Sequence, residues 1–250
     1  MYGGFRIQKR KDKMTDTYIA LDLETTGLSP SADRILEIGA VKVVHGQVKE
    51  TYATLVNPGR KIGERIEALT GITDDMASGG MDTGKAVREL VEFCEDFPLL
   101  GHNILFDYGF IKQNALNLGL SIDCEGIDTL KIARTLLPDL EHRSLEALCV
   151  YYKIRQENAH RALSDAVNAM ELYGRMREQF PDSPEEIFKP VPLIYKAKKQ
   201  GAITPAQKGY LNDLIKYHKI TLEVAVDSLT KNEASRIIDR IILEYGRIQR

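Results

Sequence analysis

The chain has 250 residues, enough for one full domain and a small second one, and its 43% hydrophobic and 28% charged residues are typical of a globular protein with a core. Three widely spaced cysteines without a Cys-x-x-Cys pair argue against a disulfide framework and a zinc site, and they favour a reducing, cytoplasmic compartment. The net charge of −2 is unpromising for a polyanion-binding protein, and with no recognisable signal peptide or long apolar run we expect no membrane partner.

The charge is unevenly distributed along the chain. Residues 1–15 carry a net charge of +4, residues 16–180 carry −9, and residues 181–250 carry +3. The first segment lacks apolar periodicity, so we interpret it as a flexible basic extension. A carboxylate-rich metal site would contribute to an acidic middle, and basic flanks would help to hold a polyanion, although ordinary solvated surface gives the same distribution.

The first predicted elements are three antiparallel strands. Residues 18–23 are apolar with β-forming side chains, and the turn Thr25-Thr26-Gly27 ends them. Residues 35–48 alternate as a second strand, and residues 51–56 form a third that ends at Asn57-Pro58-Gly59. Short turns between such strands predict a meander.

The pattern then changes to helices that alternate with short buried strands. Strands are predicted at residues 99–102 and 122–128, and helices at residues 64–70, 83–97, 105–118, 129–136, 145–152 and 161–180. Antiparallel strands followed by this alternation predict an α/β domain at residues 16–180, with a mixed sheet and helices on both faces.

Two segments follow this domain. Residues 181–203 contain four prolines and the run Lys-Ala-Lys-Lys, and we interpret them as a linker. Residues 204–250 are predicted to form a small helical module. Its helices should begin at Thr204-Pro205, an N-cap followed by proline, and at the capping box Thr230-Lys-Asn-Glu233.

The first of three acidic motifs is Leu21-Asp-Leu-Glu-Thr-Thr-Gly27. Asp22 and Glu24 are two apart on a strand, so both side chains leave the same face of the sheet. Cations would relieve their repulsion, and two Mg²⁺ or Mn²⁺ ions suit phosphoryl displacement, although Asp-x-Glu is common by chance at strand ends. Thr25, Thr26 and Gly27 offer hydroxyls and backbone N–H groups to a phosphate, or they form a plain turn.

The second motif is His102-Asn-Ile-Leu-Phe-Asp107. Asp107 opens a helix near the carboxyl end of a strand, where open α/β sheets form their sites, although helix capping is the simpler interpretation. Phe106 is either a core residue or a ring that stacks on a base.

The third motif is His160-Arg-Ala-Leu-Ser-Asp165. Residues five apart lie about 140° apart around a helix, so both ends of the motif share a site only if His160 precedes the helix and Asp165 lies in its first turns. An imidazole placed there can accept a proton near neutral pH, although a surface histidine is the simpler interpretation. Four carboxylates with a histidine suit the hydrolysis of phosphodiesters.

Together the motifs resemble those of the DnaQ-like 3′–5′ exonucleases, the histidine-bearing (DEDDh) branch of the DEDD superfamily. This family includes the proofreading epsilon subunit of DNA polymerase III and the exonuclease domain of the Gram-positive replicative polymerase. The likeness covers residues 16–180, including Glu67-Ala-Leu-Thr-Gly-Ile72 and Asp128-Thr-Leu-Lys-Ile-Ala-Arg134, and does not extend to residues 204–250.

The resemblance implies a ribonuclease H-like fold and a 3′–5′ exonuclease that releases nucleoside 5′-monophosphates from single-stranded DNA in replication proofreading or repair. It implies that His160 is the general base and that four carboxylates bind two divalent ions, Mg²⁺ or Mn²⁺: Asp22, Glu24, Asp107 and Asp165. The residues expected on the substrate side are Thr25, Thr26, Gly27, His102, Asn103 and Phe106.

Two alternatives remain at this level. An RNA 3′–5′ exonuclease would carry the same motifs, because discrimination of the 2′-hydroxyl depends on the shape of the pocket. An adaptor is the other alternative, in which residues 204–250 bind a polymerase, a helicase or nucleic acid. The intact catalytic positions argue against a protein that only binds.

Overall fold

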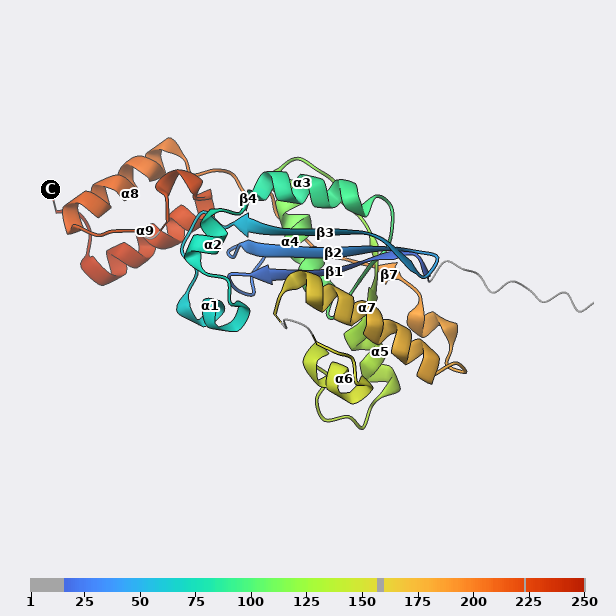
Figure 1. Cartoon of the computed structure of the whole chain (residues 1–250). Coiled ribbons are helices and arrows are strands. Elements are labelled where there is room, and N and C mark those ends of the chain that lie inside the picture. Colours follow the sequence, from blue (N-terminus) through green and yellow to red (C-terminus); the bar gives the residue numbers. More distant parts are fainter. Residues whose placement is uncertain (1–15, 157–159, 223, 250) are drawn as a thin grey trace, which may run out of the picture.

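The structure is a computed structural model that describes residues 16–156, 160–222 and 224–249, so the predicted basic extension at residues 1–15 lies outside the described residues. A seven-stranded mixed sheet forms the centre of the larger domain, in the order β4-β3-β2-β1-β5-β6-β7 (Figure 1). The strands are β1 (Tyr18–Thr25), β2 (Ile35–Val44), β3 (Gln47–Asn57), β4 (Met81–Asp82), β5 (Leu99–Gly101), β6 (Glu125–Asp128) and β7 (Val191–Pro192).

The three-stranded meander is confirmed, with boundaries set by its turns. Strand β2 ends at Val44, earlier than predicted, because His45 and Gly46 take positive φ angles in the turn to β3. Strand β1 pairs antiparallel with β2 and parallel with β5, which in turn pairs parallel with β6. The carboxyl ends of β1, β5 and β6 therefore meet at one edge of the sheet, where open α/β sheets hold their sites.

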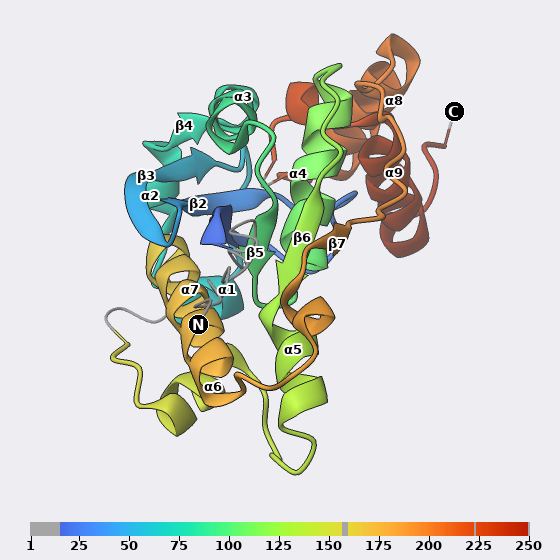
Figure 2. The ribbon, with the colours of Figure 1, turned by 90° about the vertical axis from the view of Figure 1, so that its right-hand side faces the viewer.

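Helices cover both faces of the sheet, as predicted (Figure 2). Ile19, Leu21 and Leu23 of β1 pack with α3 and α4, whereas Tyr18 and Ala20 pack with α5, α6 and α7, as the period-two alternation of a strand requires. The helices of this domain are α1 (Glu64–Thr70), α2 (Asp74–Ser78), α3 (Thr83–Cys94), α4 (Leu105–Asn117), α5 (Thr129–Leu136), α6 (Leu145–Tyr152) and α7 (Ala162–Gln179).

Helix α7 lies directly against β2 at Gly39, the cross-strand partner of Asp22. A Cβ atom at Gly39 would lie 2.1 Å from the backbone nitrogen of Leu163 and 2.2 Å from the carbonyl carbon of Ala162. Only glycine allows this close approach, which brings the start of α7 to the edge of the sheet where β1 ends.

Replacing Gly39 with Ala is therefore expected to destabilise the fold by about 1–3 kcal/mol, because the backbone of α7 must move away from β2. Gly174→Ala, in the same helix, is the matched control, because a Cβ atom there meets nothing within 4 Å. Denaturant unfolding measures both changes. Equal stabilities of the two variants would contradict the close packing at Gly39.

The segment at residues 181–203, predicted as a linker, contributes to the larger domain in its first half. It contains a short 3₁₀ helix (Glu185–Phe188) and β7, which pairs antiparallel with β6. Phe188 is buried on the side of the sheet that α5, α6 and α7 cover, and Leu193 is buried on the side that α3 and α4 cover. Pro192 fits an edge strand, where its missing N–H is tolerated.

The helical module contains α8 (Pro205–His218), a 3₁₀ turn (Val226–Ser228) and α9 (Lys231–Tyr245). Both predicted helix starts are confirmed, because Thr204 and Thr230 each form a complete capping box. The module has its own small core of buried residues: Leu211, Leu214, Leu229, Ala234, Ile238 and Ile241. Within the described part of the chain, no helix is long and apolar enough to cross a membrane.

Candidate active site

The first two acidic motifs meet at the carboxyl end of β1. Asp22 and Glu24 leave the same face of this strand, and both are half-buried. Asp107, in the first turn of α4, is 3% exposed, and its Oδ1 accepts a hydrogen bond of 3.0 Å from the backbone N–H of Leu23. This bond joins Asp107 to β1 at the residue between the two other carboxylates.

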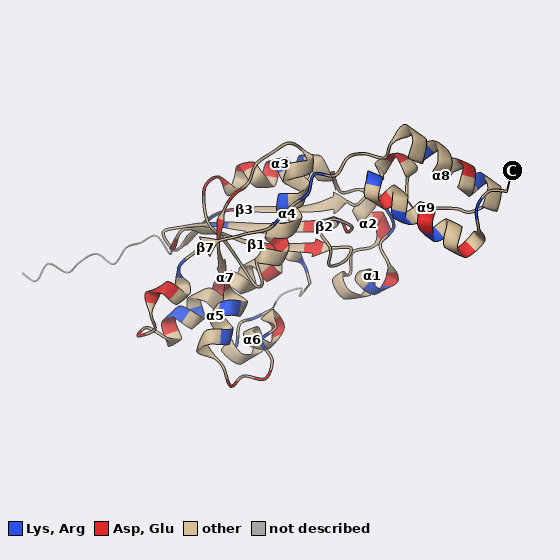
Figure 3. Ribbon diagram, turned by 180° about the vertical axis from the view of Figure 1, so that it is seen from behind, with Lys and Arg blue, Asp and Glu red and all other residues tan. Residues whose placement is uncertain are grey.

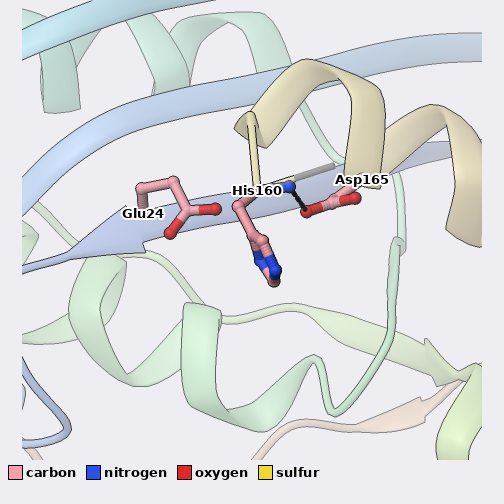
Figure 4. A group of neighbouring side chains, drawn as sticks. All are labelled: Glu24, His160 and Asp165. Atoms are coloured by element: carbon pink, nitrogen blue, oxygen red, sulfur yellow. Dashed lines mark hydrogen bonds between the residues drawn. The ribbon is translucent and has the colours of Figure 1, made fainter. Parts of the chain in front are cut away.

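The third motif reaches the same place from α7. His160 lies in the turn before the helix with φ +63°, and Asp165 lies in the first turn, which confirms the placement that the five-residue spacing requires. The backbone N–H of His160 donates to Oδ2 of Asp165 at 3.1 Å. One potential ligand atom from each of Glu24, His160 and Asp165 lies within 4.8 Å of the others (Figure 4).

A buried glutamate of β2 holds the start of α7 in place. Glu37 is 6% exposed and pairs across the strands with Glu24. Its Oε1 accepts 2.6 Å from Nη2 of Arg161, Nε of Arg161 lies 3.1 Å from each carboxylate oxygen, and the backbone N–H of Ala162 donates to Oε2 at 2.9 Å. Sequence reasoning missed Glu37, although a single acid in the apolar strand Ile35–Val44 was a usable signal.

The electrostatics of this cluster oppose the joint ionisation of its carboxyls. Burial, followed by the charges of Asp107, Asp165 and Glu24, raises the pKa of Asp22 well above its usual range. Burial is also the main cause that raises the pKa of Asp107 from 3.8 to about 8 and that of Glu24 from 4.5 to about 7. Figure 3 shows acidic residues on β1 and β2 toward the end of the sheet nearest α8 and α9.

These residues fit divalent metal ions. Hard carboxylate oxygens are the ligands that Mg²⁺ and Mn²⁺ prefer, and the cluster presents several that repel one another. A bound cation would offset that repulsion. Without a cation, some of the carboxyl groups must keep their protons. Glu24, Asp165 and the imidazole of His160 form a potential ligand group, with one ligand atom of each within 4.8 Å of the others.

Stability without divalent ions is therefore expected to fall as pH rises. Folding raises the pKa values of these carboxyl groups, so they contribute to the free energy of unfolding while they are protonated. This contribution is complete below about pH 4 and is lost as the pH rises through about 7 for Glu24 and about 8 for Asp107. Mg²⁺ replaces the protons, so its affinity should increase over the same range, and at about 100 times its Kd it should stabilise the fold by about 2.7 kcal/mol. Thermal unfolding with Mg²⁺ or EDTA from pH 5 to pH 9 measures this, and a Mg²⁺ effect that does not change with pH would contradict it.

Hydrogen bonds within the loop after β1 hold Thr25, Thr26 and Gly27. Oγ1 of Thr25 donates to the carbonyl of Gly27 at 2.7 Å, and Oγ1 of Thr26 accepts from the backbone N–H of Arg34 at 2.9 Å. A Cβ atom at Gly27 would lie 2.6 Å from the carboxylate of Asp33. The turn directly follows Glu24, so these bonds fix the shape of the backbone next to the acidic cluster.

The other expected substrate residues lie in the turn between β5 and α4 and in the first turn of α4. Asn103 is exposed and has a φ of +68°. Phe106 is half-buried, and the centroid of its ring lies 5.1 Å from that of Phe110. His102 has both ring nitrogens in hydrogen bonds of 2.9 Å, one with Oγ1 of Thr129 and one with the carbonyl of Arg143. The structure thus presents Asn103 toward solvent and uses the ring of His102 to join β5 to the loop before α6.

Comparisons with known proteins agree with this geometry. The sequence model of the exonuclease family, RNase T, matches residues 19–173. The chain is 35% identical over 177 residues to the PolC-type DNA polymerase III of Clostridium perfringens. This alignment covers 69% of this chain and 12% of that polymerase. The chain therefore spans only about an eighth of the length of that relative.

Two solved structures share the fold. Escherichia coli exonuclease I in complex with a dT13 oligonucleotide aligns with a TM-score of 0.60 and 21% identity over 66% of this chain and 42% of that one. The nuclease domain of 3′hExo, a DEDDh family member bound to rAMP, aligns with a TM-score of 0.58 and 18% identity over 68% of this chain and 95% of that one. The three motifs, the ribonuclease H-like sheet and the match over more than half of the sequence agree, and the chain belongs to the RNase T exonuclease family.

Proposed function

We propose that the protein is a metal-dependent 3′–5′ exonuclease that hydrolyses terminal phosphodiesters of single-stranded DNA and releases nucleoside 5′-monophosphates. The convergence of three separate motifs at one edge of the sheet carries the proposal. Glu24, His160 and Asp165 come within ligand distance there, and Asp107 bonds to the strand that bears Asp22 and Glu24. Family membership supports the same chemistry.

The positions of the side chains support the catalytic roles that we propose for them. Asp22, Glu24, Asp107 and Asp165 would hold two divalent ions, Mg²⁺ or Mn²⁺. When bound, such ions neutralise charge on the phosphate and favour an ionised water. His160 is exposed beside Glu24 and Asp165, and it would accept the proton of the attacking water.

The substrate strand would approach beside Asn103. An open cavity of about 500 Å³ lies next to this residue and is lined by His102, Asn103, Leu130, Arg134, Arg143 and Ser144. None of these residues is acidic, and Arg134 is exposed with a guanidinium that suits phosphate oxygens, whereas Arg143 already donates from Nε and Nη2 to the carbonyl of Leu137. Thr25, Thr26 and Gly27 would hold the terminal nucleotide, with Phe106 against its base.

DNA is the favoured substrate because the sequence relative is a DNA polymerase. An RNA 3′–5′ exonuclease is the second candidate, since one structural neighbour was solved with a ribonucleotide, rAMP. Degradation of matched single-stranded DNA and RNA oligonucleotides in Mg²⁺ tests the choice. Faster shortening of DNA is expected, whereas faster shortening of RNA would overturn it.

Proofreading of replication or repair of DNA is the proposed context, which would place the protein in the cytoplasm. The replicative polymerase relative supports it. The module of α8 and α9 would then contact a polymerase, a helicase or nucleic acid. A stable complex of the full chain with such a partner that is lost when exposed residues of α8 are replaced would support this role.

A further inference from the structure

The helical module contacts the larger domain at the end of the sheet where β1 and β3 finish (Figure 1). Nη2 of Arg34, in the loop after β1, donates to both carboxylate oxygens of Glu233 at 2.7 and 2.8 Å. Arg60, in the loop after β3, also pairs with Glu233 and donates from Nη1 to the carbonyl of Ala32 at 3.1 Å. A single carboxylate of α9 thus joins two loops of the exonuclease domain.

The environment of Glu233 favours its charged form. Its side chain is 7% exposed, and burial alone would raise its pKa. The backbone N–H of Thr230 and the guanidinium of Arg34 outweigh burial, and the pKa of Glu233 is lowered. Glu233 is therefore charged where it forms ion pairs with Arg34 and Arg60.

Helix capping does not explain this charge. In α8 the equivalent position of the capping box is Gln207, which bonds to Thr204 as Glu233 bonds to Thr230. A neutral amide is thus sufficient to cap a helix of this module. What glutamine cannot do is neutralise Arg34 and Arg60.

The contact continues from Arg34 to the turn beside the acidic cluster. The backbone N–H of Thr26 donates to the carbonyl of Arg34 at 2.8 Å, and the backbone N–H of Arg34 donates to Oγ1 of Thr26 at 2.9 Å. Thr26 lies two residues after Glu24, just beyond the shift in the register of β1 on β2 between Glu24 and Thr25. A displacement of Arg34 would therefore move the turn that is proposed to hold the terminal nucleotide.

We propose that Glu233 is a positioning residue of the exonuclease, through which the helical module fixes the turn of Thr25, Thr26 and Gly27 for the 3′-terminal nucleotide. This inference rests on the proposed function. It gives the module a role within the same chain, in addition to any partner that the module binds. The module would thereby affect the binding of the strand end rather than the chemistry at the carboxylates.

The full-length Glu233→Gln variant tests the inference, because it keeps the capping box and removes the charge. We expect KM for a single-stranded DNA oligonucleotide to rise about tenfold, since small misplacements of a binding group weaken the productive complex, while kcat changes less than about threefold. Glu244→Gln, exposed near the end of the same helix, is the control and should match the parent. Parent values of KM and kcat for Glu233→Gln would overturn the inference.

Arg34→Gln examines the contact from the other side, which keeps the test decisive if Glu233→Gln is less stable. The double variant should raise KM no more than the larger single effect, whereas multiplied effects would show separate roles and overturn the inference. Binding of the oligonucleotide to Asp165→Asn, with and without Glu233→Gln, gives a readout that requires no cleavage, and about a tenfold weaker Kd is expected. Absence of nuclease activity in the parent would refute the proposed function, whereas an active parent with an unaffected Glu233→Gln would refute only this inference.

Discussion

Replacing Asp165 with Asn is expected to reduce cleavage of single-stranded DNA at least about a thousandfold, the kinetic equivalent of several kcal/mol of lost charge stabilisation. The carboxylate of Asp165 lies within 4.8 Å of potential ligand atoms of Glu24 and His160, so its loss would weaken the proposed metal site from the side of α7. The amide has nearly the same shape and retains an oxygen that can accept the 3.1 Å bond from the N–H of His160. The fold should therefore persist.

Initial rates on an end-labelled oligonucleotide in Mg²⁺ measure the effect, and circular dichroism checks the fold. Asp139→Asn, an exposed aspartate after α5, controls for the loss of one negative charge and should retain the parent rate. A folded Asp165→Asn variant that still cleaves at a rate near that of the parent would refute the assignment of the cluster.

Replacing His160 with Gln is expected to lower kcat by about 10²–10⁴-fold, the usual contribution of a positioned general base. The imidazole is exposed and extends from a turn with φ +63°, next to Glu24 and Asp165, where it can reach an attacking water. The loss should diminish at alkaline pH, because hydroxide then replaces the missing base.

The kinetic comparison needs a histidine that is equally exposed but distant in role. His142→Gln, in the loop before α6, serves this purpose and should leave kcat unchanged. A His160→Gln variant within about threefold of the parent kcat at neutral pH would exclude the general-base role, since even a modest base contributes more.

Much of the fold was predictable because its signals are local. The apolar, β-forming run at residues 18–23, the turn residues after it and the caps Thr204 and Thr230 each act within a few residues, and the structure has the predicted elements there. Helix α2 and strand β4 escaped prediction because five and two residues are too few to show a period.

The placement of the acidic motifs was predictable only in part. That Asp22 and Glu24 share a face follows from strand geometry, and the five-residue spacing required His160 to precede α7. The bonds from Arg161 to Glu37 and from Arg34 to Glu233 join residues 124 and 199 positions apart, and no local pattern specifies such pairs. They depend on how the chain packs as a whole.

The linker shows how tertiary pairing overrides composition. Four prolines in residues 181–203 indicate a break in regular structure, yet Val191–Pro192 pairs with β6 at the edge of the sheet and Leu193 is buried. An edge strand tolerates proline because one side of it makes no ladder bonds. The same composition therefore fits a free linker and a sheet edge equally well.

The proposed role of metal ions at the carboxylate cluster is to drive cleavage from the 3′ end. It is tested most directly by incubating a 5′-labelled single-stranded DNA oligonucleotide with the full chain in Mg²⁺, Mn²⁺ or EDTA and resolving the products. The expected result is a ladder that shortens from the 3′ end with release of nucleoside 5′-monophosphates in either metal, and intact DNA in EDTA. Shortening that persists in EDTA, or intact DNA in both metals, would contradict it.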